Sequence, residues 1–227
     1  MKFDISYSPS FAMATARLES DESVVAESGA MVSMSDNISI QTSSRQGRSG
    51  GVFKALKRAA LAGESFFLNT YTAAGGPGEV TFAPALPGDI TTIPMTGGSV
   101  IVQSTSFLAG SAGVNIDSKW GGFKTFFGGE GFFMIKATGQ GEMAVNSFGA
   151  IHELELNGPY VVDTGHIVAF QETLGFKVQR VGSWKSTFFS GEGLVCLFDG
   201  QGKLWIQSRN PGAFGKAIGS KLPPRES

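Results

Sequence analysis

Apolar and polar positions along this 227-residue chain follow two patterns, and each pattern occurs three times in the same order. In the first pattern, an apolar run leads to an acid or amide, then to a hydroxyl residue, and then to a second apolar run. The three copies are residues 23–32, 99–108 and 160–168, with turn markers Glu27, Gln103 and Asp163. Such a run predicts two strands joined by a tight turn, because short polar side chains and glycine favour turn geometry.

The second pattern lies downstream of the first in each copy. An aromatic–lysine pair precedes a glutamate that stands among small or glycine residues, and a glycine turn and an alternating strand follow. The lysines are Lys54, Lys124 and Lys185, and the glutamates are Glu64, Glu130 and Glu192. Alternation after a glycine turn is typical of a β-hairpin.

The two patterns together predict an all-β protein with little helix, made of three tandem copies of one β-unit. The expected units are residues 1–90, 91–150 and 151–215, followed by a flexible tail at 216–227. A unit this small leaves an apolar face uncovered, so neighbouring units would bury it. The chain has 19 phenylalanines, which suit such interfaces because they are flat and carry no polar group that needs a partner.

One segment departs from the β pattern. Residues 52–62 have apolar positions at helical spacing, with Lys54, Lys57 and Arg58 on another face. We favour a short surface helix that ends at Gly63. The alternative is peripheral contact with an anionic lipid surface or a partner. Beyond residue 210, three prolines and mixed charge predict one helical turn and a frayed end.

Composition and charge narrow the function classes. The chain holds 18 Lys and Arg against 19 Asp and Glu, so it lacks the basic excess of a general nucleic-acid binder. A lone cysteine, Cys196, excludes a disulfide framework and a cysteine zinc site, and its apolar neighbours predict a buried, unreactive thiol. The sequence offers neither an apolar leader nor a membrane-spanning run, so we expect a cytoplasmic protein.

The candidates for catalysis are few. His152, Glu153 and His166 are the residues from which a mononuclear metal site would be built, but their spacing is not that of ligands. Asp163 opens a motif similar to that of aspartic proteases. Because its counterparts in the other copies are Glu27 and Gln103, we interpret it as a turn residue.

The three glutamates of the second pattern could together surround a cation or a polar ligand. We favour a structural role for Glu64, Glu130 and Glu192, since a carboxylate at a hairpin corner satisfies turn amides. No catalytic constellation and no cofactor site emerge, so the chain is not expected to be an enzyme.

Several motifs resemble the signatures of the altered-inheritance-of-mitochondria 24 family, in the same order and from about residue 3 to 215. They are residues 22–31 (ESVVAESGAM), 82–90 (FAPALPGDI), 149–151 (GAI), 162–166 (VDTGH), 191–195 (GEGLV) and 207–211 (QSRNP). The resemblance implies three short double-stranded β-helix units, each similar to a subunit of the tryptophan RNA-binding attenuation protein. It also implies a homotrimer whose nine units close a ring.

The resemblance implies no reaction and no catalytic residues. We therefore expect a non-enzymatic oligomeric scaffold that organises partners. One form of this hypothesis places the scaffold near a membrane. The first alternative is a ring that binds a small ligand between its β-units. Two further alternatives are a metal-dependent enzyme and an RNA-binding ring; Lys54, Lys124 and Lys185 would form the positive belt of the latter.

Overall fold

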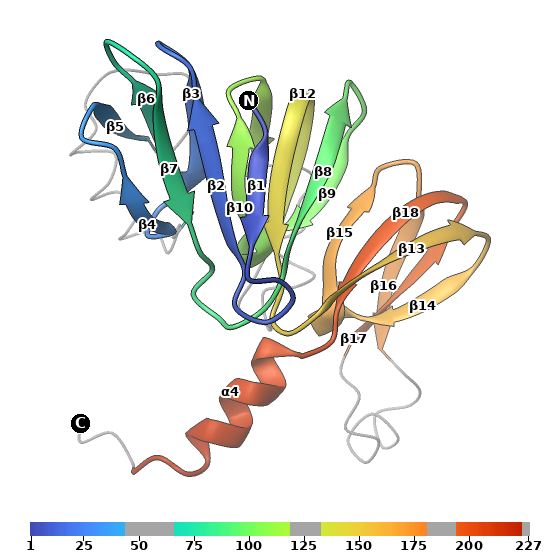
Figure 1. Ribbon diagram of the computed structural model, residues 1–227. Coiled ribbons are helices and arrows are strands. Elements are labelled where there is room, and N and C mark those ends of the chain that lie inside the picture. Colours follow the sequence, from blue (N-terminus) through green and yellow to red (C-terminus); the bar gives the residue numbers. More distant parts are fainter. Residues whose placement is uncertain (44–65, 119–132, 181–193, 224–227) are drawn as a thin grey trace.

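The computed structural model describes residues 1–43, 66–118, 133–180 and 194–223, and antiparallel strands make up most of it (Figure 1). The prediction of an all-β protein with little helix is confirmed for this part of the chain. The predicted hydrophobic alternation is visible within single strands. In β2 (Met13–Leu18), for example, Ala14, Ala16 and Leu18 are buried and alternate with more exposed residues.

Within the described residues, the strands form three sheets. The first has the order β1-β2-β7-β4, the second runs β13-β18-β15-β9-β12-β10-β3-β6-β5 with β8 and β11 also paired to β12, and the third is β14-β17-β16. The first sheet comprises β1 (Phe3–Ser6), β2, β7 (Gly78–Phe82) and β4 (Met31–Met34). The third comprises β14 (Tyr160–Asp163), β17 (Leu194–Asp199) and β16 (Gly175–Arg180). The second comprises β13 (Ile151–Asn157), β18 (Gln201–Gln207), β15 (Ile167–Gln171), β9 (Val100–Gln103), β12 (Met134–Asn146), β10 (Phe107–Ser111), β3 (Ser23–Glu27), β6 (Leu68–Ala73), β5 (Ile38–Ser43), β8 (Ile90–Thr96) and β11 (Val114–Asp117).

Strand β12 is the longest, with 13 residues, and it has four partners. Its first half pairs with β9 and β11, and its second half pairs with β8 and β10. The change of partners occurs at Gly139, where φ is +104° and an added Cβ would lie 2.1 Å from the carbonyl oxygen of Gly113. Only glycine tolerates both the positive φ and this close backbone approach.

The first predicted pattern folds as expected, with a refinement in two copies. Residues 23–32 form β3, a turn and the start of β4. In the other copies the turn is a short 3₁₀ helix: η1 (Ser104–Ser106) joins β9 to β10, and η3 (Thr164–His166) joins β14 to β15. A single turn of 3₁₀ helix is a common compact connector between elements.

Aromatic rings mark the three clusters of buried side chains. Tyr71 and Phe82 meet edge to face at 5.3 Å in the first cluster, and Phe170 and Phe198 do so at 5.1 Å in the third. Phe107 is fully buried in the second cluster. Cys196 is buried in the third, and desolvation raises the pKa of its thiol to about 12, so the prediction of a buried thiol is confirmed.

Helix α4 (Pro211–Gly219) leaves the strands at one end of the molecule (Figure 1). Asn210 caps it, since its Oδ1 accepts a hydrogen bond from the Ala213 amide at 3.1 Å, and Pro211 takes the first helical position. The helix is longer than the single turn that the sequence predicted. Across the described residues, the structure contains no helix whose length and apolar character would let it cross a membrane.

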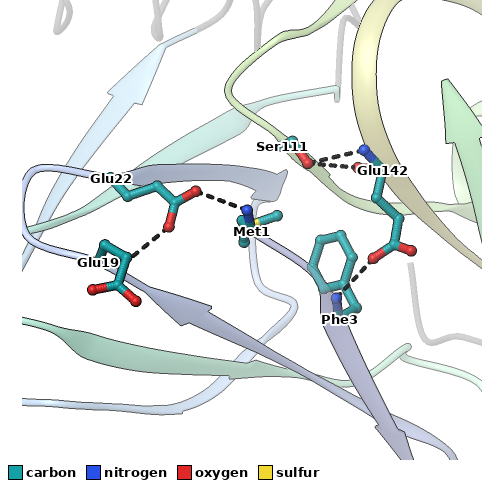
Figure 2. Close-up of polar contacts among 6 residues, drawn as sticks. All are labelled: Met1, Phe3, Glu19, Glu22, Ser111 and Glu142. Atoms are coloured by element: carbon teal, nitrogen blue, oxygen red, sulfur yellow. Dashed lines mark hydrogen bonds and ion pairs between the residues drawn. The ribbon is translucent and has the colours of Figure 1, made fainter. Parts of the chain in front are cut away.

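Two carboxylates attach the N-terminal strand to the remainder of the structure (Figure 2). Oε2 of Glu142 accepts a hydrogen bond from the Phe3 amide at 2.8 Å. Ser111 exchanges hydrogen bonds with the backbone of Glu142 at 3.0 and 3.1 Å, which fixes that carboxylate in place. Glu22 lies 2.9 Å from the terminal amine of Met1 and accepts the Glu19 amide at 3.0 Å.

We expect Glu142→Ala to lower the free energy of unfolding by about 1–3 kcal/mol, because the Phe3 amide loses its acceptor. Glu142→Gln keeps an oxygen at that position and should cost less. Urea titrations at one fixed protein concentration measure both changes. Asp36→Ala, at an exposed acid, serves as the control and should stay within about 0.5 kcal/mol of the parent. Equal stability of the alanine variant and the parent would contradict the role of Glu142.

Candidate functional site

Part of the predicted site lies outside the described residues. This applies to Glu64, Glu130 and Glu192, to the segment 52–62, and to the lysines Lys54, Lys124 and Lys185. Their roles stay predictions.

Asp163 holds a turn together. Its Oδ1 accepts a hydrogen bond from the Gly165 amide at 2.9 Å, which caps η3, and a second one from Nδ2 of Asn210 at 3.3 Å. The first contact lies within the turn, and the second joins the turn to the N-cap residue of α4, 47 residues further along the chain. This placement agrees with the interpretation of Asp163 as a turn residue.

The two histidines have separate environments. Nδ1 of His166 lies 2.7 Å from the carbonyl oxygen of Gln207, and because a carbonyl only accepts, this nitrogen carries the proton. His152 is exposed on β13. Glu153 accepts hydrogen bonds from Nε1 of Trp205 at 2.9 Å and from Nζ of Lys203 at 2.5 Å. In the described ranges, no group of three or more His, Cys, Asp or Glu side chains is placed to hold a metal ion.

The structure instead brings polar groups together in a cavity of about 220 Å³. Its wall comes from segments that are far apart in the sequence: the end of β3, the connection from β7 to β8, η1, the end of β12 and the start of α4. The lining residues are Glu27, Ala85, Leu86, Thr105, Ser106, Asn146, Phe148, Gln207 and Pro211. Among them Glu27 is the one ionisable residue.

Asn146 leaves an acceptor without a partner in this cavity. Its Nδ2 donates to the carbonyl oxygen of Thr105 at 3.2 Å, which fixes the orientation of the amide, since that carbonyl can only accept. Oδ1 is buried and has no hydrogen-bond partner, and the residue is only 7% exposed. An unsatisfied buried acceptor costs about 1–3 kcal/mol.

Gln207 shows what one additional methylene group changes. It ends β18 as Asn146 ends β12, and its Nε2 donates to the carbonyl oxygen of Gly165 in η3 at 2.9 Å. Its Oε1, however, accepts the amide of Phe148 at 2.8 Å. The longer side chain therefore satisfies both ends of its amide group. The shorter side chain of Asn146 satisfies one end and leaves the other buried without a partner.

Glu27 is half-buried at the end of β3. Burial disfavours the charged form of the carboxyl and raises its pKa to about 7. Among the lining residues that the structure describes, no lysine or arginine offsets this cost. The carboxyl is therefore held ready to ionise near neutral pH if a positive group enters.

The remaining wall is apolar. Leu86, Phe148 and Pro211 contribute to it, and the ring of Phe148 meets that of Phe214 edge to face at 5.1 Å, so α4 supports this wall from outside. The guanidinium of Arg209 lies 5.8 Å from the Phe148 ring centroid. The cavity therefore combines an acidic, acceptor-rich side with an apolar side.

The sequence patterns do not predict this site. They give Glu27 only as a turn marker and do not single out Asn146 or Phe148. The sequence does contain one signal, the resemblance between Asn146-Ser147 and Gln207-Ser208 at the ends of two alternating strands. It becomes informative only when the partners of the two amides are known.

Comparison with known proteins gives a consistent result. The family model described as "Mitochondrial biogenesis AIM24" matches residues 3–209. An uncharacterized protein of Streptococcus pyogenes is 31% identical over 230 residues, which cover 98% of this chain and 92% of that protein. The crystal structure of a Streptococcus pyogenes protein is similar with a TM-score of 0.78 and 26% identity, covering 97% of this chain and 99% of that one.

We expect Glu27→Gln to remove a pH dependence of stability. A carboxyl with a raised pKa binds its proton more tightly in the folded state, so its contribution to stability is lost as pH rises from about 4.5 to about 7. At pH 8 the glutamine variant should be more stable than the parent by about 1–2 kcal/mol, allowing for partial solvent screening. At pH 4 this advantage should disappear.

Urea titrations at pH 4 and pH 8 measure this difference. Glu22→Gln is the matched control of opposite sign. The Glu19 amide lowers the pKa of Glu22, so its stabilising contribution is present at pH 8 and lost in acid. A Glu27→Gln variant that follows the parent at both pH values would refute the assigned pKa.

Proposed function

The chain belongs to the family described as Mitochondrial biogenesis AIM24, and from that premise we propose that it is a non-enzymatic scaffold which assembles into a ring. The ring forms through the edges of its own sheets. The observation that carries the proposal is a pairing scheme that recurs along the chain and leaves β4 and β14 without the inter-unit partner that their counterparts in the other units have.

The recurring scheme supports three tandem units like the subunit of the tryptophan RNA-binding attenuation protein. In the first unit, β7 pairs with β2 and β4, and β6 pairs with β3 and β5. In the second, the halves of β12 replace β7 and β6, with partners β8, β10, β9 and β11. In the third, β18 pairs with β13 and β15, and β17 pairs with β14 and β16.

Consecutive units are joined in the same way each time. β3 of the first unit pairs with β10 of the second, with Ala26 opposite Ala109. β9 of the second pairs with β15 of the third, with Val102 opposite Ala169. By the same rule β14 of the third unit would pair with β4, which the first unit of another copy supplies.

The side chains at these two edges favour the pairing. Five large apolar residues there are exposed, namely Met31 (37%), Val32 (54%), Met34 (38%), Tyr160 (42%) and Val161 (58%). An exposed apolar edge strand is an aggregation hazard unless another strand covers it. A second copy of the chain would supply β14 as the neighbour of β4, and a further contact of the same kind would cover the other edge.

The recurrence also predicts the register of this contact. Strands β4, β10 and β15 each contain one shift in pairing register. The residues directly after this shift are Ser33, Ala109 and Ala169. Val162 of β14 takes the position in the third unit that Ala26 of β3 takes in the first and Val102 of β9 takes in the second. The proposed contact therefore sets Ser33 opposite Val162 and Met34 opposite Val161 of the neighbouring copy. Such a head-to-tail contact closes into a ring, and the family resemblance favours three copies.

The alternatives from the sequence receive less support. A metal-dependent enzyme would need His152 and His166 to converge, and the contacts of the described residues do not place them in one cluster. An RNA-binding ring depends on Lys54, Lys124 and Lys185, about which the described residues say nothing. The small-ligand alternative has a specific observation in its favour, the cavity lined by Glu27 and Phe148.

Helix α4 supports the idea that the ring works beside a membrane. Phe214 and Ile218 of the helix and Leu222 just beyond it are 44%, 47% and 64% exposed, at intervals of four residues. Lys216 and Lys221 lie among them. An apolar stripe accompanied by lysines suits an anionic lipid surface. The segment 52–62 would add a second basic contact of the same kind.

Double cysteine variants test the ring. Residues directly opposite each other in an antiparallel pair have Cα atoms about 4.5–5.5 Å apart, within disulfide range. Met34→Cys with Val161→Cys should therefore form covalent oligomers on mild oxidation, up to three times the chain mass of 23.8 kDa. Cys196 is buried and should not compete. Non-reducing electrophoresis and native mass spectrometry measure the result.

The matched control combines Met34→Cys with Tyr160→Cys, which shifts the pair by one residue to the opposite face of β14. It should cross-link far less. Equal cross-linking of the two variants would refute the register, and a monomer in native mass spectrometry of the parent would refute the ring.

The membrane part of the proposal predicts co-sedimentation with anionic phosphatidylserine vesicles and little with phosphatidylcholine vesicles. Ile218→Ser with Leu222→Ser should reduce the bound fraction at least twofold by removing the apolar stripe. Lys54→Gln with Lys57→Gln and Arg58→Gln tests the 52–62 segment separately. Absence of binding to the anionic vesicles would refute membrane contact.

A further inference from the structure

Strands β2, β8 and β13 take the same place in the three units, but their outer edges differ. Each pairs on one side with the strand that follows the glycine turn of its unit, namely β7, the second half of β12, or β18. On its other side β2 pairs with β1. Within the described residues, β8 and β13 have no strand at this outer edge. The covered edge of β2 is therefore a template for what an open edge binds.

A proline protects the open edge of β8. Directly after this strand, the Gly97 amide donates to the carbonyl oxygen of Gly139 in β12 at 3.1 Å. Because backbone groups alternate in direction along an antiparallel strand, those of Pro94 face away from β12. Proline has no N–H, so the middle of this edge offers no donor to an added strand.

Strand β13 has no such protection. Pro94 is the fifth residue of β8 (Ile90–Thr96), and the fifth residue of β13 (Ile151–Asn157) is Glu155. Directly after β13, the Gly158 amide donates to the carbonyl oxygen of Gly200 at 2.9 Å. By the same alternation, the backbone groups of Glu153 and Glu155 face away from β18, where an added strand would meet them.

Strand β1 shows how an edge of this kind is covered. The fifth residue of β2 is Arg17, whose Nε donates to the carboxylate of Asp4 in β1 at 2.7 Å. On either side of Asp4, Phe3 is buried and Ile5 packs against the first cluster. The covering strand thus has the pattern apolar–charged–apolar, and its charge is opposite to that of the edge residue beside it.

The edge of β13 has the opposite charge and an incompletely covered apolar residue. Glu153 and Glu155 are both exposed. Leu154 between them is half-buried beside the third cluster, whereas Ile93, at the same position of β8, is 2% exposed. A strand that covers β13 would therefore carry a basic residue where β1 carries Asp4, with an apolar residue on each side.

We propose that β13 binds an extended segment of a partner protein as an added antiparallel strand, with the pattern apolar–basic–apolar and its basic residue beside Glu155. Main-chain hydrogen bonds would supply affinity, and the alternating side chains would supply selectivity. Glu153 already accepts hydrogen bonds from Lys203 and Trp205, so Glu155 sets the charge of the partner. The inference rests on the proposed function in that a scaffold needs partners, but β13 and β18 belong to one chain, so the edge does not require the ring.

The test uses the sequence of β1 as the probe. The lysine peptide, KFKISYS, is residues 2–8 of this chain with lysine in place of Asp4, and the aspartate peptide, KFDISYS, keeps the parent residue. Both are acetylated and amidated. Ligand-observed NMR titrations of the full chain should give a dissociation constant about tenfold lower for the lysine peptide, because like charges across a strand pair are destabilising.

Backbone methylation of the lysine peptide tests the strand geometry. The Phe3 amide donates to Glu142 and therefore faces away from β2, so alternation directs the amide of the next residue to the edge strand. N-methylation of the central lysine should accordingly weaken binding about tenfold by removing a main-chain hydrogen bond. N-methylation of the isoleucine that follows, whose amide faces away, should have a much smaller effect.

Two substitutions of Glu155 test the edge from the protein side. Glu155→Pro copies Pro94 of β8: it removes the outward amide, keeps the pairing with β18, and should weaken binding of the lysine peptide about tenfold. Glu155→Arg copies Arg17 and should shift the ratio of the two dissociation constants about tenfold towards the aspartate peptide. Asp36→Arg makes the same charge change at an exposed turn and should leave that ratio unchanged. Thermal unfolding checks that each variant is folded.

Failure of the parent to bind the lysine peptide, equal affinity for the two peptides, or unchanged affinity in folded Glu155→Pro would each overturn the proposal. Native mass spectrometry of the same samples reports the ring separately. A parent that assembles but binds no peptide would thus overturn this inference alone. Association between rings that Glu155→Pro abolishes would identify a second copy as the occupant of the edge and would overturn the partner segment.

Discussion

Backbone pairing along β12 is the constraint on which the rest of the described structure depends. Four strands hydrogen-bond to this one strand, two to each half, and the second and third clusters of buried residues both draw on it. The arrangement requires the chain to change partners at Gly139, against the backbone of Gly113. A side chain at Gly139 would separate the two backbones, and the buried amides nearby would lose their partners.

The cavity follows from the way β12 ends. Its last residue, Asn146, lies beyond the final ladder contact with β10, where the backbone turns towards β13. An amide side chain there donates to η1 much as Gln207 donates to η3. The difference of one methylene group decides whether the amide oxygen reaches a backbone donor or stays free. The length of the side chain thus determines that the amide oxygen of Gln207 is hydrogen-bonded and that of Asn146 is not.

The sequence allowed the fold class and several local features to be predicted, because these depend on neighbouring residues. Alternation revealed strands, and the Asp163 turn and the burial of Cys196 followed from their immediate surroundings. The site could not be predicted in the same way. Glu27 and Asn146 are far apart in the chain, and whether Oδ1 is satisfied depends on a backbone amide contributed by another segment. The raised pKa of Glu27 likewise depends on which side chains surround it.

The exposed edges and the cavity have a common physical origin but distinct consequences. Each is a position where a contact made elsewhere in the chain is missing: a second neighbour for β4 and β14, and a donor for Asn146. Missing strand contacts expose a row of backbone groups that another strand can match, so they favour association with a second copy. A missing contact at a buried side chain leaves a single acceptor unsatisfied within one chain. The proposed assembly therefore draws on the sheet edges and not on the end of β12.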